Sequence, residues 1–239
     1  LAPGTRSALE HGGAAPAIVD RSADLDALIE PMVKGGYYHA GQVCVSTQRI
    51  FVHSTLMPAF VDRFVTRVRA LRVGDPLSPE TEVGPLINPG EVDRVDSWIA
   101  EAAAGAAKVV AGGKRRSATV MEPTVLVEPA PDARVSRNEV FGPVCCVYGF
   151  DQLDDAIDRA NSLPTAFQAS VFANDIDAAL HAADRLDASA VMINDHTAFR
   201  TDWMPFAGRR ESGYGVGGIP FPLRDMLQEK LIVLSGLAL

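Results

Sequence analysis

Residues 144–193 read VCCVYGFDQLDDAIDRANSLPTAFQASVFANDIDAALHAADRLDASAVMI and carry the clearest signal of the fold class. Short apolar runs alternate here with longer segments whose apolar residues recur at helical spacing. The expected elements are strands at 144–150, 169–172 and 190–193, a helix from the cap Asp151 to about residue 161, and a helix from the cap Asp175 to about residue 186. This alternation predicts an α/β fold: a parallel-rich sheet with helices on both faces, ending in a separate strand.

The alternation continues toward the N-terminus. Asn88, Pro89 and Glu91 form a strong helix start, with Asn88 as the cap, and Gly105 ends that helix. A helix at 22–35 begins at Ser22 or Asp24, and Pro31 is expected to kink or shorten it. The remaining expected elements are strands at 49–52, 108–111 and 124–127, a helix from the cap Ser54 to about residue 71, an irregular stretch at 194–222, and a closing strand at 230–235.

The closing strand stands apart from the rest of the pattern, behind a tract rich in Gly and Pro. We therefore expect a catalytic domain at 1–218 and a C-terminal linker with an oligomerisation strand at 219–239. A lone strand cannot satisfy its own backbone groups, so it must pair with another sheet or another subunit.

Composition narrows the class of protein. The 239 residues carry a net charge of −8, which disfavours nucleic-acid binding through a basic face. Hydrophobic residues make up 47% and charged residues 22%, as in ordinary globular domains. No apolar run is long enough to span a membrane, and the first residues lack a secretory pattern. We expect no nucleic-acid partner, no membrane and a cytoplasmic location.

The three cysteines are Cys44, Cys145 and Cys146. This odd count, with no CxxC spacing, favours a reducing compartment without disulfides. The five histidines show no ligand spacing, so we expect no metal site. Cys145 and Cys146 lie in an apolar strand and are expected in the core.

Cys44 is the most informative residue. It lies between a predicted helix and a predicted strand, directly after Gly41-Gln42-Val43, in a tight turn at the end of a sheet. Small ligands bind at such ends in α/β folds. A lone cysteine is more often a small buried hydrophobe. The functional interpretation is a thiolate nucleophile, which needs a lowered pKa or a nearby base.

Two carboxylates stand beside glycines. Glu10 precedes His11-Gly12-Gly13, and it is either a solvated residue near a turn or a general base that activates water. Glu139 and Phe141 precede Gly142-Pro143 and could present both side chains on one rim of a site, or the Phe could be core. Residues 213–218 satisfy G-x-G-x-x-G, but no strand precedes them, and Pro220 and Pro222 oppose a following helix.

Taken together, these motifs resemble the aldehyde dehydrogenase superfamily over essentially the whole chain. That family carries Glu-x-Gly-Gly, Gly-Gln-x-Cys, Glu-x-Phe-Gly-Pro-Val and Pro-Phe-Gly-Gly…Ser-Gly-x-Gly in this order. The corresponding stretches here are 10–13, 41–44, 139–144, and 205–208 with 212–215. His11 stands where a hydrophobic residue is more usual, and Ala207 replaces the first glycine of the usual pair.

Family members are about twice this length, and the resemblance begins just before Glu10. It therefore implies the catalytic domain and oligomerisation strand without the nucleotide-binding half, so the isolated chain is expected to be incomplete for dehydrogenase turnover. The resemblance leaves the choice between NAD and NADP open. It also implies a homodimer or homotetramer.

The resemblance further implies a mechanism. Cys44 attacks an aldehyde, hydride passes to NAD or NADP, and Glu10 activates a water that hydrolyses the thioester to a carboxylic acid. Glu139, Phe141 and Gly12 are the implied cofactor-binding residues. Alternatives are a thiol esterase that needs no nucleotide, and an inactive oligomerisation module.

The small-molecule aldehyde is less well specified. Tyr38, Arg200 and Phe206 fall where the family lines its substrate site. Arg200 suggests an anionic aldehyde, because guanidinium pairs bidentately with carboxylate, phosphonate or sulfonate groups. The alternative is a surface ion pair between Arg200 and Asp195 or Asp202.

Overall fold

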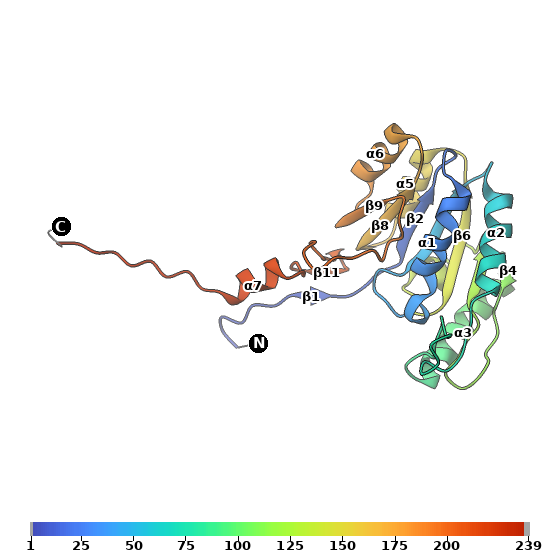
Figure 1. Ribbon diagram of the computed structural model, residues 1–239, viewed down its shortest axis with the longest axis horizontal. Coiled ribbons are helices and arrows are strands. Elements are labelled where there is room, and N and C mark those ends of the chain that lie inside the picture. The colour runs from blue at the N-terminus through green and yellow to red at the C-terminus, as the bar shows by residue number, and fades with distance from the viewer. Residues whose placement is uncertain (1, 237–239) are drawn as a thin grey trace.

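A seven-stranded sheet forms the centre of the computed structural model, which describes residues 2–236 (Figure 1). Leu1 and residues 237–239, the outer ends of the two segments expected above, lie outside the described residues. In spatial order the strands are β4 (Lys108–Ala111), β5 (Thr124–Val127), β6 (Val144–Phe150), β3 (Thr47–His53), β2 (Ala15–Val19), β8 (Gln168–Phe172) and β9 (Ala190–Ile193). β4 pairs antiparallel with β5, and every other pairing in this sheet is parallel. The predicted fold class is confirmed.

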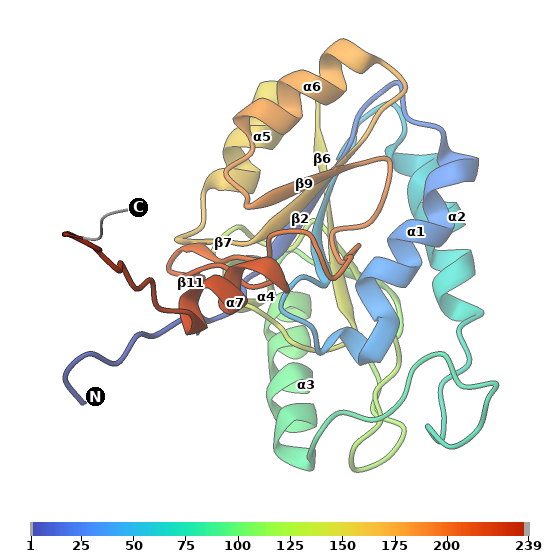
Figure 2. The same cartoon turned by 60° about the vertical axis from the view of Figure 1, so that its left-hand side comes forward.

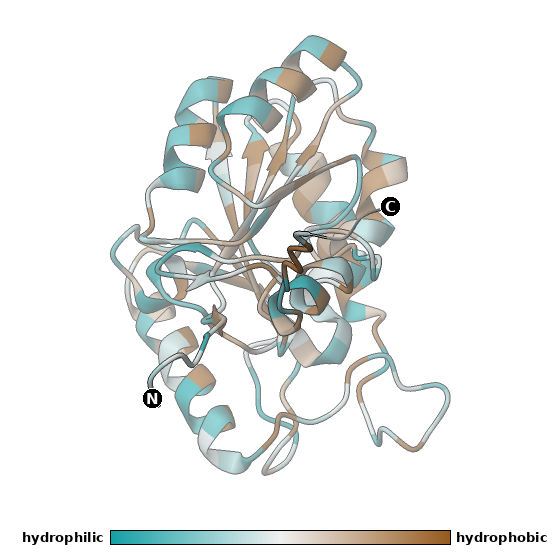
Figure 3. Ribbon diagram, turned by 90° about the vertical axis from the view of Figure 1, so that its left-hand side faces the viewer, coloured by the Kyte–Doolittle hydropathy of each residue, from teal (hydrophilic) through white to brown (hydrophobic). Residues whose placement is uncertain are grey.

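Helices cover both faces of the sheet (Figures 1 and 2). α1 (Leu25–Tyr37) and α2 (Met57–Arg69) pack together on one face, and α5 (Leu153–Asn161) and α6 (Ile176–Arg185) pack on the other. Side chains of β3 alternate between the two layers. The ring of Phe51 lies 5.0 Å from the guanidinium carbon of Arg159 on α5, whereas Ile50 turns to the opposite layer and is fully buried. The strands of the sheet are mostly brown, that is, apolar, in Figure 3.

Shorter elements complete the chain. They are β1 (Leu9–Glu10), the 3-10 turn η1 (Tyr38–Gly41), α3 (Pro89–Ala104), α4 (Arg134–Arg137), β7 (Thr165–Ala166), β10 (Arg209–Arg210), β11 (Gly213–Tyr214) and α7 (Pro220–Met226). β1 pairs antiparallel with β11, and β7 pairs antiparallel with β10. The first ladder ties the beginning of the chain to the stretch after β9, and the second ties the segment before β8 to the same stretch.

Several expected helix starts are confirmed. Asn88 caps α3 by accepting a hydrogen bond from the backbone N–H of Glu91, and Gly105 ends that helix. Asp24 caps α1, and Asp175 caps α6, each through its carboxylate. Pro31 lies inside α1 without ending it.

Two expected caps are wrong. The Ser54 hydroxyl donates to the carboxylate of Asp151, so neither side chain caps a helix. Both residues directly follow the carboxyl ends of adjacent strands, β3 and β6, and they therefore meet each other before they meet a helix. α2 begins at Met57 and α5 at Leu153, each without a side-chain cap.

The C-terminal expectations also need correction. α7 follows the glycine-rich stretch despite Pro220 and Pro222, because a proline at the first helical position needs no backbone N–H. Residues 230–235 form no strand with any residue that the structure describes. They leave the body as an extended segment (Figure 1), since a strand exists only where its backbone groups are paired. Within the described residues, no helix has the length and apolarity needed to cross a membrane.

Candidate active site

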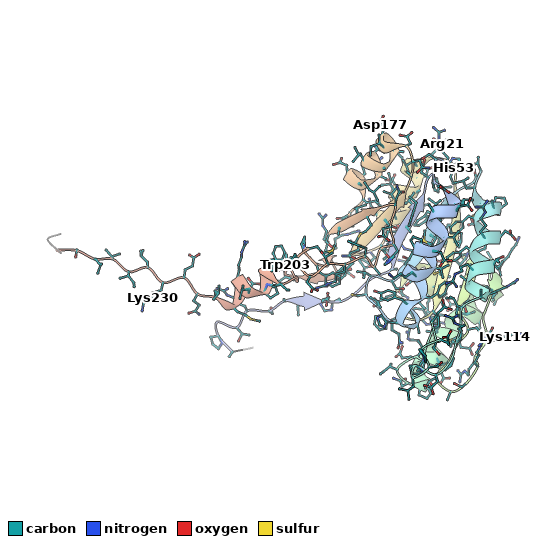
Figure 4. All side chains as sticks on the ribbon, in the orientation of Figure 1. Arg21, His53, Lys114, Asp177, Trp203 and Lys230 are labelled. Carbon is teal, nitrogen blue, oxygen red and sulfur yellow. The ribbon has the colours of Figure 1, made fainter. Side chains whose placement is uncertain are left out.

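The turn that carries Cys44 lies between η1 and the amino end of β3. Figure 4 labels His53, the last residue of β3, and Arg21, which follows β2; both mark the opposite, carboxyl end of the sheet. The turn enters through three consecutive left-handed residues, His39 (φ +50°), Ala40 (φ +56°) and Gly41 (φ +71°). Non-glycine residues in this region are strained, and such strain gathers at functional sites.

Gly41 permits the close approach of a second loop. A Cβ atom at Gly41 would collide with the carbonyl group of Gly142. The turn therefore packs backbone against backbone with the loop that carries Glu139 and Phe141. Two of the sequence motifs are joined at this contact.

Gln42 braces the same turn from the other side. Its Nε2 donates to the carbonyl oxygens of His39 and Pro85, at 3.2 Å each, and its Oε1 accepts from the N–H of Ile87 at 2.9 Å. One amide thus ties the turn to the loop that precedes α3. The strained backbone before Cys44 is held by these contacts.

Cys44 is half-buried beside a small apolar cluster that is separate from the main core. The residues of this cluster are Val45, Phe167 and Ala198, with Tyr38, Val43, Cys44 and Phe206 packed against them. The Phe167 and Phe206 ring centroids are 4.7 Å apart. Tyr38 and Phe206, which were expected to bind substrate, therefore pack against the same apolar cluster as Cys44. This environment suits the organic group of a substrate.

The pKa of the Cys44 thiol is shifted by the charges of several predicted site residues. The pKa of the Cys44 thiol is raised to about 11, chiefly by burial and in addition by the negative charges of Glu10 and Glu139. Hydrogen bonding to the backbone N–H of Cys44 and the positive charge of Arg200 oppose this rise in pKa. The resting side chain at neutral pH is therefore the thiol, which must lose its proton before it can act as a nucleophile.

Glu10 is exposed at the end of β1. It pairs with Gly213 of β11, and the N–H of His11 donates to the carbonyl oxygen of Ser212 at 2.8 Å. A Cβ atom at Gly213 would collide with the carbonyl group of Leu9, so this ladder needs the glycine. The glycine-rich stretch thus holds the strand that carries Glu10. Glu10 also lines a cavity of about 390 Å³, together with Phe206.

Glu139 is joined to the glycine pair that follows Glu10. The N–H of Gly13 donates to Glu139 Oε1 at 3.1 Å. A Cβ atom at Gly12 (φ +76°) would collide with the same carboxylate. Burial raises the pKa of Glu139, and the hydrogen bond from Gly13 and the charge of Arg94 act in the opposite direction. The structure therefore brings Gly12 and Glu139 into direct contact.

Phe141 projects from the same loop. It is 39% exposed and has a left-handed backbone, with φ +47°. A large apolar side chain held outward in a strained conformation beside a half-buried carboxylate makes a rim that a flat ring could contact. That Glu139 and Phe141 present their side chains on one rim stays a prediction.

Arg200 lies over the ring of Phe206, with its guanidinium carbon 4.1 Å from the ring centroid. Within residues 2–236 it forms no ion pair with Asp195 or Asp202, so the surface-pair alternative is not what the structure shows. Its charge acts on the Cys44 thiol instead.

His196 is not among the residues predicted for the site. Its Nδ1 accepts a hydrogen bond from the N–H of Ala198 at 3.2 Å, so Nε2 carries the proton of the neutral ring. Burial lowers the pKa of His196, which keeps the ring neutral at pH 7. The residue lies in an irregular stretch where periodicity gives no signal. No three His, Cys, Asp or Glu side chains among the described residues gather as a metal site.

The chain is similar in sequence to known aldehyde dehydrogenases. The aldehyde dehydrogenase family matches residues 2–232. The 3-sulfolactaldehyde dehydrogenase of Priestia aryabhattai is 37% identical over 227 residues, which are 95% of this chain and 47% of that protein. The lactaldehyde dehydrogenase of Methanocaldococcus jannaschii is 36% identical over 228 residues, 95% of this chain and 49% of that protein.

Solved structures give the same result. Aldehyde dehydrogenase 21 of Physcomitrella patens, solved with the reaction product succinate, matches with a TM-score of 0.93 and 32% identity, over 98% of this chain and 48% of that one. Glyceraldehyde-3-phosphate dehydrogenase of Methanocaldococcus jannaschii, solved with NADP, matches with a TM-score of 0.90 and 35% identity, over 94% and 49%. The chain spans about half the length of the relatives it matches.

Proposed function

The chain belongs to the aldehyde dehydrogenase family, and we propose that it is the catalytic part of an enzyme that oxidises an aldehyde to a carboxylic acid with NAD⁺ or NADP⁺. The observation that carries the proposal is that the charges of Glu10, Glu139 and Arg200 all act on the pKa of one thiol, that of Cys44. In this proposal Cys44 is the nucleophile, Glu10 the base and Arg200 a cation that favours the thiolate. A nucleophile with a base beside it is what acyl transfer through a thioester requires.

The first step is attack by Cys44 on the aldehyde carbon. Because its pKa is about 11, the thiol must transfer its proton to a carboxylate or to water as it attacks. Arg200 favours the thiolate through its charge. In the proposed mechanism the backbone N–H of Cys44 donates to the oxyanion that forms on the thiohemiacetal.

The residues on the rim fit a nicotinamide nucleotide. Glu139 offers a carboxylate to a ribose hydroxyl, Phe141 offers an exposed ring, and Gly12, without a Cβ atom, lets the Glu139 carboxylate lie against its backbone. Such a nucleotide supplies the acceptor for the hydride that leaves the thiohemiacetal carbon. Cys44 then holds the acyl group as a thioester.

Glu10 acts in the last step. Its exposed carboxylate can accept a proton from a water molecule, which then attacks the thioester carbon. The carboxylic acid leaves, and the Cys44 thiolate is regenerated. Tyr38 and Phe206 line the site of the organic group.

We propose further that the aldehyde carries an anionic group. Arg200 is free of the ion pairs expected as the alternative, and 3-sulfolactaldehyde dehydrogenase is the name of one relative. Replacement of Arg200 by Ala should raise KM about tenfold or more for charged aldehydes and leave KM for neutral ones within about twofold. Equal losses for both kinds of substrate would sink this idea.

The segment at 219–239 is proposed as the oligomerisation segment of a dimer or tetramer, with residues 1–218 as the catalytic domain. Its described part exposes a run of apolar side chains along an extended backbone. Light scattering would give the molar mass of the wild-type chain and of Ile232→Asp. The variant should have the lower mass, and equal masses would contradict a role of this segment in oligomerisation.

The decisive experiment compares ester and aldehyde as substrates. With 4-nitrophenyl acetate, the chain should release nitrophenol in a burst and gain an acetyl mass on Cys44. Cys44→Ser should abolish the burst, and Glu10→Gln should retain it but slow the steady state by about tenfold or more. Aldehyde oxidation that requires NAD⁺ or NADP⁺ separates a dehydrogenase from a simple esterase. If Cys44 reacts with neither substrate, the remaining hypothesis is that the chain is an inactive oligomerisation module.

A further inference from the structure

Val140 lies between Glu139 and Phe141, and side chains hold both of its backbone groups. Its N–H donates to Gln48 Oε1 at 2.8 Å. Its carbonyl oxygen accepts from Arg94 Nη2 at 2.7 Å. The peptide planes on both sides of Val140 are therefore fixed, and with them the directions in which Glu139 and Phe141 leave the backbone.

Gln48 makes the inner half of this clamp. It is buried on β3, four residues after Cys44. Its Nε2 donates to the carbonyl oxygens of Val135 at 2.9 Å and Asn138 at 2.8 Å, while its Oε1 holds Val140. All three hydrogen bonds of this amide go to backbone groups of residues 135–140. The strand that begins beside the nucleophile thus also grips the loop of the rim.

Arg94 makes the outer half. It lies on α3, and Glu91 pairs with its guanidinium at 2.7 Å. The guanidinium carbon also lies 4.8 Å from the ring centroid of Trp98. These contacts hold the group that reaches the Val140 carbonyl. Its charge also lowers the pKa of Glu139, which favours the ionised carboxylate on the rim.

The loop needs such a clamp because its conformation is unfavourable. Phe141 has φ +47°, and a bulky residue adopts this region only when surrounding contacts impose it. The buried Val140 side chain and the two hydrogen bonds impose it here. Without them Phe141 would relax, and Glu139 would lose its alignment with the N–H of Gly13.

We propose that Gln48 and Arg94 are positioning residues that set Glu139 and Phe141 for the nicotinamide nucleotide. The inference rests on the proposed function for its purpose, although the clamp itself does not. The proposal predicts that replacing Gln48 or Arg94 weakens nucleotide binding at Glu139 and Phe141 but leaves the reaction of Cys44 with an ester unchanged.

The test uses Arg94→Gln, because Arg94 is partly exposed and its replacement leaves the core intact. Arg134→Gln is the matched control. Arg134 also lies over Trp98, at 5.5 Å, and also pairs with a glutamate, but it does not touch Val140. Hydrogen exchange of the peptide that contains Val140 should be about fivefold faster in Arg94→Gln and unchanged in Arg134→Gln.

Two further readouts separate positioning from a general loss of structure. The burst of 4-nitrophenol from Cys44 should stay within about twofold in both variants. In a preparation that oxidises aldehydes, KM for NAD⁺ or NADP⁺ should rise about tenfold in Arg94→Gln alone. Gln48→Glu, which retains the acceptor but removes the two donors, should give the same pattern.

Equal hydrogen exchange at Val140 in the wild type, Arg94→Gln and Arg134→Gln would overturn the proposal. Faster exchange over the whole chain of Arg94→Gln would overturn it too. A wild-type chain without any burst would overturn the proposed function instead. The exchange contrast at Val140 would then still decide whether the clamp exists.

Discussion

The backbone N–H of Gly13 donates a 3.1 Å hydrogen bond to Glu139 Oε1, across 126 positions of sequence. This bond joins the glycine pair after Glu10 to the loop that carries Phe141. Gly41 joins the same loop to the turn of Cys44 by packing against Gly142. Three motifs that are separate in the sequence therefore meet at one end of the sheet, through one hydrogen bond to a side chain and one contact between backbones.

Replacing Gly12 by Ala should disturb this junction. The new Cβ would meet the Glu139 carboxylate, and φ +76° is unfavourable for alanine. We expect a loss of about 2–4 kcal/mol in the free energy of unfolding, measured by denaturant titration. Gly4→Ala is the control, because Gly4 has φ +83° with nothing within 4 Å of the added Cβ. It should lose only the cost of the left-handed backbone, about 1 kcal/mol, and equal losses would contradict the role of the contact.

The raised pKa of Cys44 predicts its reactivity with pH. With a pKa of about 11, the thiolate fraction and the rate of alkylation by iodoacetamide should rise about tenfold per pH unit between pH 7 and pH 10. Peptide mass spectrometry would measure this rate. Cys145 and Cys146 are fully buried and should stay unlabelled in the folded chain, which makes them internal controls. A plateau below pH 8 would mean that the pKa is depressed instead.

The charges around Cys44 should act in opposite directions. Glu10→Gln removes a negative charge that raises the thiol pKa, so alkylation at pH 8 should become roughly two- to fivefold faster. Arg200→Gln removes a positive charge that lowers this pKa, so alkylation should become slower by a similar factor. Rates that move together, or not at all, would show that these side chains do not face the thiol.

Ala40 tests the strained turn. It is buried with φ +56°, a conformation that glycine adopts freely and β-branched residues avoid. Ala40→Gly should stay within about 1 kcal/mol of the wild-type stability, because relief of strain offsets the lost contact and the added chain entropy. Ala40→Val should lose about 3 kcal/mol or more in thermal or chemical unfolding. A well-tolerated valine would show that the turn can adopt another conformation.

Regular elements were predictable where one physical signal dominates. The strands β4, β5, β6 and β9 have the bounds expected from their apolar runs, and α3 begins at Pro89 behind its Asn88 cap. The central strand β2 was missed, because Ala15–Val19 begins with small residues and a proline and is too short to show a period. Ser54 and Asp151 failed as caps because tertiary proximity gave each a partner that local sequence does not show.

The site was predictable in its residues but not in its supports. Cys44, Glu10 and Glu139 each lie within three residues of a glycine, and glycines mark close backbone approaches. Gln48 and Arg94 carry no such signal, since a glutamine in a strand and an arginine on a helix are ordinary surface patterns. Their partners are backbone groups of one distant loop, and only the folded chain brings these together.

The extended C-terminal segment has a consequence for the handling of this chain. Leu231, Ile232, Val233 and Leu234 are each at least 70% exposed, and among the described residues their backbone has no ladder partner. Such a run is a template for cross-β growth, with Glu229 and Lys230 as charged gatekeepers on one side only. At high concentration the chain should therefore add to free sheet edges wherever it meets them, and dilution or a charge within the run is the remedy against fibres.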